Sequence, residues 1–151
     1  MINIKDITTA IESRLKVNTT LMALGCTVER SVRINYDPGR CPWVGIYPGI
    51  VDTLPKAMSG RKWVDTLEPQ IVIQAQSMTD DGTEASDMLE DAIDATLEEL
   101  GGEGKDLSLG LAGVRILGFS REYRYVVFDT DGSGQLFMPQ AIVRVKIEAR
   151  S

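Results

Sequence analysis

The sequence predicts an α+β protein with a mostly antiparallel, mixed β-sheet and two α-helices packed on one face. Three observations lead to this prediction. Apolar residues recur every three or four positions in two segments, 4–16 and 83–100. They alternate with polar residues in segments 63–76, 117–127 and 141–149, and turn-forming residues separate the last two. Helices that cover the apolar face of a sheet bury all of these segments at once.

The first segment predicts an amphipathic helix over residues 4–16. Its apolar residues are spaced by three, four and four positions, namely Ile4, Ile7, Ile11 and Leu15. Asn3 is placed to cap the helix by accepting a free amide hydrogen of the first turn. Asp6 lies near the positive end of the helix dipole and Arg14 near the negative end, so both charges favour the helix.

Shorter elements are expected between this helix and the first long strand. The pattern of residues 19–34 is ambiguous, but its second half alternates and predicts a strand containing Val28, Val32 and Ile34. Residues 36–42 carry turn chemistry, and a short apolar strand, 43–47, follows them. Residues 48–60 hold prolines and glycines without periodicity, which predicts a long loop or a projecting arm.

The second half of the chain predicts long elements. Residues 63–76 alternate cleanly, as in a strand with one wet face. A helix is expected over 83–100, ended by Gly101 and Gly102, and a flexible glycine-rich loop over 101–113. Two strands joined by a hairpin turn at 129–134 close the chain. With 151 residues and no repeat, the sequence predicts one domain, 1–151.

Composition limits the classes of function. The chain carries 16 Lys and Arg against 22 Asp and Glu, a formal net charge of −6, which argues against gripping nucleic acid through its phosphates. It has no histidine, so the commonest general base and metal ligand are missing and most hydrolase mechanisms are disfavoured. No secretory or membrane-spanning segment is expected.

Two cysteines, Cys26 and Cys41, lie 15 residues apart without a CxxC spacing. The favoured interpretation is two reduced thiols packed as small apolar residues, with a disulfide as the alternative.

One stretch fits part of a calcium loop. Asp129, Asp131 and Ser133 occupy alternate ligand positions and Gly134 the sixth position. The twelfth position, which needs a bidentate glutamate, is Gln140. A plain polar hairpin explains the same residues, so this metal site is the weaker interpretation.

Charge is also distributed unevenly along the chain. Residues 80–100 contain nine acids and no base, whereas the remaining residues carry a net charge of +3. The acids of this helix form either a solvated face or a surface that meets basic residues of another subunit or lines a passage. A different class, a small enzyme or ligand-binding module, would place a pocket beside the 48–60 segment, with Tyr47, Asp52 and Asp65 as its nearest candidates.

The order of elements resembles the tail-terminator, or tail-completion, proteins of long-tailed bacteriophages. The resemblance covers nearly the whole chain. It rests on the Ile4 to Leu15 helix, the segment Cys41-Pro42-Trp43-Val44-Gly45-Ile46-Tyr47-Pro48, the 63–76 strand leading into Asp87-Met88-Leu89-Glu90-Asp91-Ala92-Ile93, and the closing hairpin.

This resemblance implies a structural virion protein at the head-proximal end of the tail. It implies a hexameric ring that stops tail polymerisation, contacts the tail tube protein and head or neck connector proteins, and lets DNA pass without sequence-specific binding. No catalytic residue and no cofactor is implied, and assembly would take place in the host cytoplasm. A neck, connector or minor tail protein is the alternative within the same class. Because a ring needs two different complementary patches, the candidates for the subunit interface or lumen are Glu90, Asp94, Glu98, Arg115, Arg121, Arg124, Arg144 and Lys146.

Overall fold

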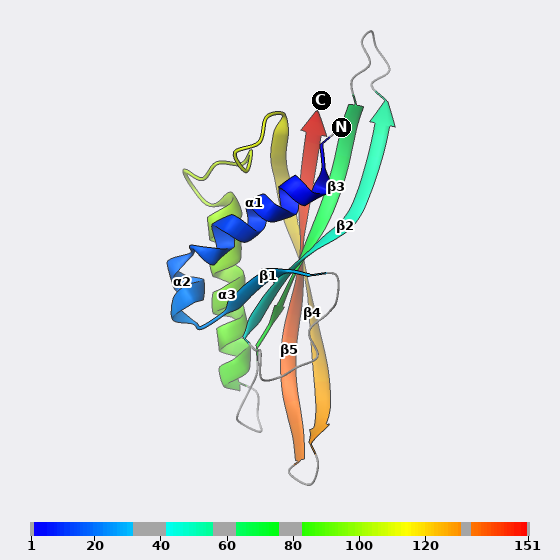
Figure 1. The fold of residues 1–151 in the computed structure, drawn as a ribbon. Helices are drawn as coiled ribbons and strands as arrows, with labels where there is room; N and C mark the ends of the chain where they lie inside the picture. The colour runs from blue at the N-terminus through cyan, green and yellow to red at the C-terminus, as the bar shows by residue number, and fades with distance from the viewer. Residues whose placement is uncertain (1, 32–41, 56–62, 76–82, 131–133, 151) are drawn as a thin grey trace.

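The computed structural model describes residues 2–31, 42–55, 63–75, 83–130 and 134–150. These residues form a five-stranded sheet and three helices, in the order α1 (Ile4–Lys16), α2 (Thr19–Ala23), β1 (Thr27–Arg30), β2 (Trp43–Pro55), β3 (Trp63–Gln74), α3 (Thr83–Gly101), β4 (Val114–Thr130) and β5 (Gly134–Arg150). The strand order is β1-β2-β3-β5-β4, and within it β1 and β2 are parallel while the other neighbours are antiparallel. The predicted α+β fold with a mixed, mostly antiparallel sheet is confirmed (Figure 1).

Helix α1 has the predicted bounds and the predicted cap. The Asn3 side chain accepts a hydrogen bond from the backbone N–H of Lys5 at 2.9 Å. Ile7, Ile11 and Leu15 are fully buried, as their spacing predicts, and each contributes roughly 1.5–3 kcal/mol by leaving water.

A short helix follows at Thr19–Ala23, within the segment whose pattern was ambiguous. Asn18 caps α2 by accepting from the backbone N–H of Leu21 at 3.0 Å. The strand expected next is present as β1, Thr27–Arg30, while Val32 and Ile34 lie outside the described residues.

Of the two alternatives for residues 48–60, the loop is wrong for residues 48–55, which continue β2 and form part of a projecting arm (Figure 1). The alternation is lost because the register with β3 shifts between Tyr47 and Ile50, at a bulge that contains Gly49 with φ +66°. Beyond the bulge, β2 pairs with β3 as far as Pro55 and Trp63, and the two strands project together past α1 (Figure 1). Residues 56–60 lie outside the described residues.

The closing hairpin is confirmed and is longer than the sequence predicts. Strands β4 and β5 pair continuously up to Thr130 and Gly134. A second register shift, between Ile116 and Gly118, leaves Leu117 as an extra residue that is 59% exposed. The sequence instead places Leu117 in phase with Phe119 and Tyr123, because a bulge is invisible to a simple alternating pattern.

Helix α3 ends one residue later than predicted, and the glycine-rich segment after it is held by hydrogen bonds. The Asp106 carboxylate accepts from the backbone N–H and the hydroxyl of Ser108, at 2.9 and 2.7 Å, and these bonds lower the pKa of Asp106. The backbone N–H of Ile116 donates to Leu107 at 2.8 Å, which ties the segment to the start of β4.

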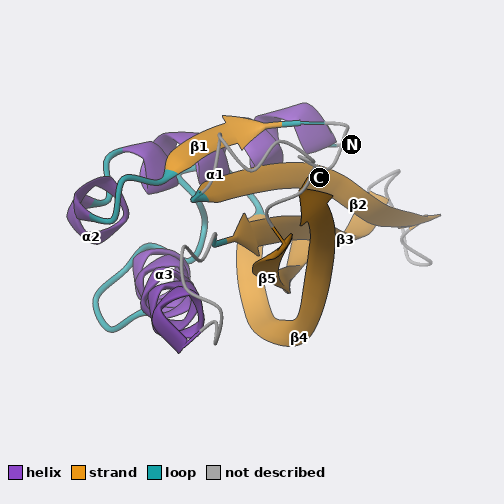
Figure 2. Ribbon diagram, turned by 90° about the horizontal axis from the view of Figure 1, so that it is seen from below, coloured by secondary structure: helices purple, strands orange, loops and turns teal. Residues whose placement is uncertain are grey.

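The two faces of the sheet differ in what packs against them. Helices α1 and α3 cover one face and share its apolar core, with α1 across β1 and β2 and α3 beside β3 and β5 (Figure 2). The opposite face, called here the helix-free face, carries a smaller buried cluster of Trp43, Val72 and Ile142. Since side chains alternate along a strand, the pairing of each residue assigns it to one face or the other.

Candidate functional site

The acidic residues of α3 lie on its solvent side. The exposed acids are Glu84, Asp87, Glu90, Asp91, Asp94 and Glu98, whereas apolar residues such as Leu89 and Ile93 face the core. Glu99 is half-buried and pairs with Lys105, with 2.9 Å between Nζ and Oε2. The described part of α3 therefore presents six exposed carboxylates on one helix surface.

A groove of about 420 Å³ lies between α2 and α3, called here the acidic groove. Leu24, half-buried, and Ala95, 8% exposed, supply its apolar lining. The carboxylates of Asp91, Asp94 and Glu98 line the same groove. The groove thus combines an apolar surface with three negative charges.

Two other predicted residues, Glu90 of α3 and Arg121 of β4, lie near Tyr123. The hydroxyl of Tyr123 donates to the carboxylate of Glu90, which raises the pKa of Tyr123 above its ordinary value. The positive charge of Arg121 nearby lowers the pKa of Tyr123, and the negative charge of Asp94 raises it further. The register pairs Arg121 with buried Val143, so Arg121 lies on the face that the helices cover.

The remaining predicted basic residues lie on the helix-free face. Arg144 and Arg124 both donate to Glu122, at 2.9 and 3.0 Å, and these bonds hold the pKa of Glu122 below its ordinary value. Arg144 also lies 3.9 Å from a Glu68 oxygen. These two arginines are therefore already paired with acids of the same chain.

Arg115 and Lys146 differ from those arginines. Both are exposed, and neither forms an ion pair with any residue that the structure describes. Arg115 pairs across the hairpin with Glu148, and Lys146 pairs with Gly118, on either side of the bulge at Leu117. The structure thus separates Arg124 and Arg144, which pair with acids of the same chain, from Arg115 and Lys146, which flank an exposed leucine.

The predicted pocket residues beside the 48–60 segment do not come together. Tyr47 is half-buried on the helix-free face, and Asp52 is exposed on the projecting part of β2. Asp65 is 2% exposed and accepts from the backbone N–H of Ile2 at 3.3 Å, on the side of the helices. Asp65 pairs with Thr53, the residue that follows Asp52 in β2. Because neighbouring residues of a strand point to opposite faces, Asp52 and Asp65 lie on opposite faces of the sheet.

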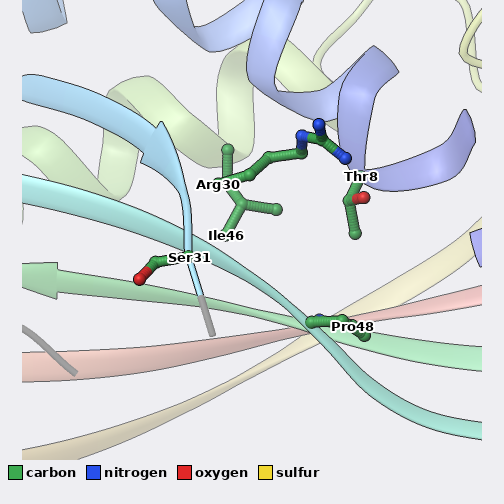
Figure 3. Close-up of a pocket in the computed structure, with 5 residues that line it drawn as sticks. All are labelled: Thr8, Arg30, Ser31, Ile46 and Pro48. Carbon is green, nitrogen blue, oxygen red and sulfur yellow. The ribbon is translucent and has the colours of Figure 1, made fainter. Parts of the chain in front are cut away.

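A hollow of about 420 Å³ lies between α1 and the first two strands, lined by Thr8, Arg30, Ser31, Ile46 and Pro48 (Figure 3). The Thr8 hydroxyl donates to backbone carbonyls of α1, and the Arg30 guanidinium lies 3.8 Å from Glu12. None of its described lining residues is a carboxylate or a thiol.

A second hollow, of about 330 Å³, lies on the helix-free face over Val72 and Ile142. Beneath its rim the side-chain amide of Gln74 donates to Gln140 Oε1 at 3.1 Å, and both residues are buried. Trp43 Nε1 donates to Glu29 at 2.8 Å. The sequence pattern does not predict this buried polar pair, because both glutamines fall in the polar phase of amphipathic strands.

The calcium loop considered around Asp129 stays untested. Asp131 and Ser133, two of its three candidate ligands, lie outside the described residues. Asp129 pairs with Gln135, and Gln140 lies five residues further along β5, about 17 Å away at the rise of a strand. Gln140 is bonded to Gln74. No cluster of three or more potential ligands suited to a metal ion occurs among the described residues.

Cys26 is a free thiol, half-buried against the core, and burial raises its pKa to about 11. Cys41 lies outside the described residues, so the predicted alternatives for the pair are not tested. Within the part of the chain that the structure describes, no helix is long and apolar enough to span a membrane.

The chain is similar in structure to solved proteins, whereas its sequence gives no match. The sequence matches no known protein-family model and no curated protein. The structure is similar to a chain in the solved virion of a native gene transfer agent particle, with a TM-score of 0.55 and 14% sequence identity. The similarity covers 95% of each chain, so the two chains share one fold from end to end.

Proposed function

We propose that this protein is a structural component of a phage-like virion, without catalytic activity or cofactor. The observation that carries the proposal is the shared fold with a chain of the gene transfer agent virion, which covers 95% of both chains. The position of Asp65 on the opposite face of the sheet from Tyr47 and Asp52 supports the same assignment, because among the described residues these three candidates do not share one site.

Within this class the proposed role is that of a tail terminator. The chain forms a ring, with six subunits as the expected number, at the head-proximal end of the tail tube. It stops tube polymerisation and offers a surface to the head or neck connector proteins. The resemblance in element order to tail-terminator proteins supports this role, as does the net charge of −6, which lets DNA pass without adhering.

The direct test is a tube-polymerisation assay with the tail tube protein encoded beside this chain. Adding the purified protein is expected to stop tube growth, and electron microscopy is expected to show rings at one end of each tube. Tubes that grow equally with and without the protein would contradict the terminator role.

A neck or connector protein is the alternative role in the same class, and the same assay separates the two. A neck protein is expected to bind purified heads and to leave tube growth unchanged. Light scattering adds the oligomeric mass, because a ring former approaches the mass of six chains of 16.6 kDa at high concentration.

A further inference from the structure

We infer that the acidic groove between α2 and α3 receives the exposed bulge of β4 from a second copy of this chain. The bulge surface, called here the basic bulge, consists of Arg115, Leu117 and Lys146. This inference rests on the proposed ring, because it names the contact that joins neighbouring subunits.

The basic bulge has the properties of one half of a contact. Leu117 is 59% exposed because the register shift between Ile116 and Gly118 makes it the extra residue of a bulge. Bulges redirect a side chain away from the regular ladder. Arg115 and Lys146 flank it without an ion pair to any described residue. An exposed leucine between two exposed cations is therefore available to a partner that is apolar at its centre and acidic around it.

The acidic groove has the matching properties. Its apolar lining comes from Leu24 and Ala95, and three carboxylates, those of Asp91, Asp94 and Glu98, line the same space. Helix α3 itself contains no lysine or arginine that could neutralise these acids. Seating Leu117 against Leu24 and Ala95 brings Arg115 and Lys146 towards opposite charges, so both apolar burial and electrostatics favour this contact.

The positions of the two surfaces favour a ring over a simple dimer. The groove lies on the side of the sheet that the helices cover, whereas Arg115 and Lys146 lie on the helix-free face, as their pairing across β4 and β5 shows. Two different patches on opposite faces give head-to-tail contacts, which close into a ring when the rotation per subunit allows it.

The experiment uses charge reversal in the full chain and measures assembly by sedimentation velocity at low salt. The groove variant carries Asp91→Lys and Glu98→Lys, and the bulge variant carries Arg115→Glu and Lys146→Glu. Each variant alone is expected to need about tenfold or more protein to reach half-assembly. An equimolar mixture is expected to assemble, because each reversed surface then meets a complementary one.

Control variants reverse charges outside the two surfaces. Glu84→Lys with Asp87→Lys reverses two exposed acids at the first turns of α3, outside the groove, and Lys5→Glu reverses an exposed lysine of α1. Both controls are expected to assemble like the wild type. A melting curve for each variant checks that it folds, and recovery in the mixture cannot come from two unfolded chains.

The outcomes separate this inference from the proposed function. Wild-type assembly of either reversed variant, a mixture that stays monomeric, or equal losses in the controls would overturn the groove contact and leave the ring proposal standing. A wild-type chain that stays monomeric at high concentration and with tail tubes present would overturn both.

Discussion

The guanidinium of Arg14 donates a hydrogen bond to the backbone carbonyl of Glu99, which joins the end of α1 to the last turn of α3. The same side chain donates to the carbonyl of Asp106 at 2.7 Å. Carbonyls at the end of a helix have no partner within the helix, and they carry the negative end of its dipole. One arginine therefore satisfies a carbonyl of the last turn of α3 and ties the two helices to each other.

Replacing Arg14 with alanine is expected to lower the free energy of unfolding by about 1–3 kcal/mol, because two charge-assisted hydrogen bonds are lost. Urea denaturation measures the change. The matched control is Lys16→Ala, which removes an exposed i,i+4 ion pair with Glu12 and is expected to cost less than about 0.5 kcal/mol. Equal losses for the two variants would contradict the structural role of Arg14.

The buried glutamine pair is expected to show strong coupling. Gln140→Leu removes the acceptor of the Gln74 amide at a buried site and is expected to cost about 1–3 kcal/mol of unfolding free energy. Replacing both glutamines with leucine is expected to cost less than the sum of the two single changes, since no amide is then left without this partner. Chemical denaturation of the four proteins in the cycle measures the coupling, and strict additivity would show that the pair does not act as a unit.

The bulge of β2 depends on a glycine. Gly49 has φ +66°, and a Cβ placed there would lie 1.9 Å from the backbone oxygen of Glu68. Gly49→Ala is therefore expected to destabilise the protein by about 1–3 kcal/mol or more. Gly118→Ala is the matched control, because a Cβ at Gly118 has no atom within 4 Å and the backbone has no positive φ. Thermal melting is expected to show a lower Tm for the first variant and an unchanged or higher Tm for the second.

Burial of Cys26 predicts a loss of stability at high pH. Its pKa is about 11 in the folded chain, against an ordinary value of 9.0. Between these values the unfolded chain releases the proton while the folded chain keeps it, so the unfolding free energy falls as pH rises from about 9 to about 11. In a Cys41→Ser background, comparing Cys26 with Cys26→Ala by denaturation at pH 8 and pH 10.5 isolates this contribution. A difference between the two proteins that does not change with pH would contradict it.

Local patterns predicted the long elements well. The spacing of Ile7, Ile11 and Leu15 placed α1 within its observed bounds, and the alternation after residue 140 placed β5, because both follow directly from which residues must leave water. The patterns failed at Gly49 and Leu117. At each of these a bulge inserts one residue, and the partner strand, which is distant in the sequence, decides whether pairing resumes.

Some features of the candidate surfaces could likewise be predicted from the sequence, and others could not. The acids of α3 and the absence of histidine could be read from residue identities, and the exposure of six of those acids follows from the helical period. The sequence could not show that Arg144 is paired with Glu122 while Arg115 forms no ion pair with a described residue. Ion pairing depends on which strands become neighbours.

The sequence by itself determined the amphipathic elements, their order and the imbalance of charge along the chain, because these depend on residue identity and on periods of two and 3.6 residues. Only the tertiary structure decided that β2 runs on through residues 48–55, that the acidic groove lies between α2 and α3, and that Leu117 is an exposed extra residue of a bulge, near Arg115 and Lys146 of the helix-free face. Those features arise from pairing and packing between segments far apart in the chain, and no local pattern carries that information.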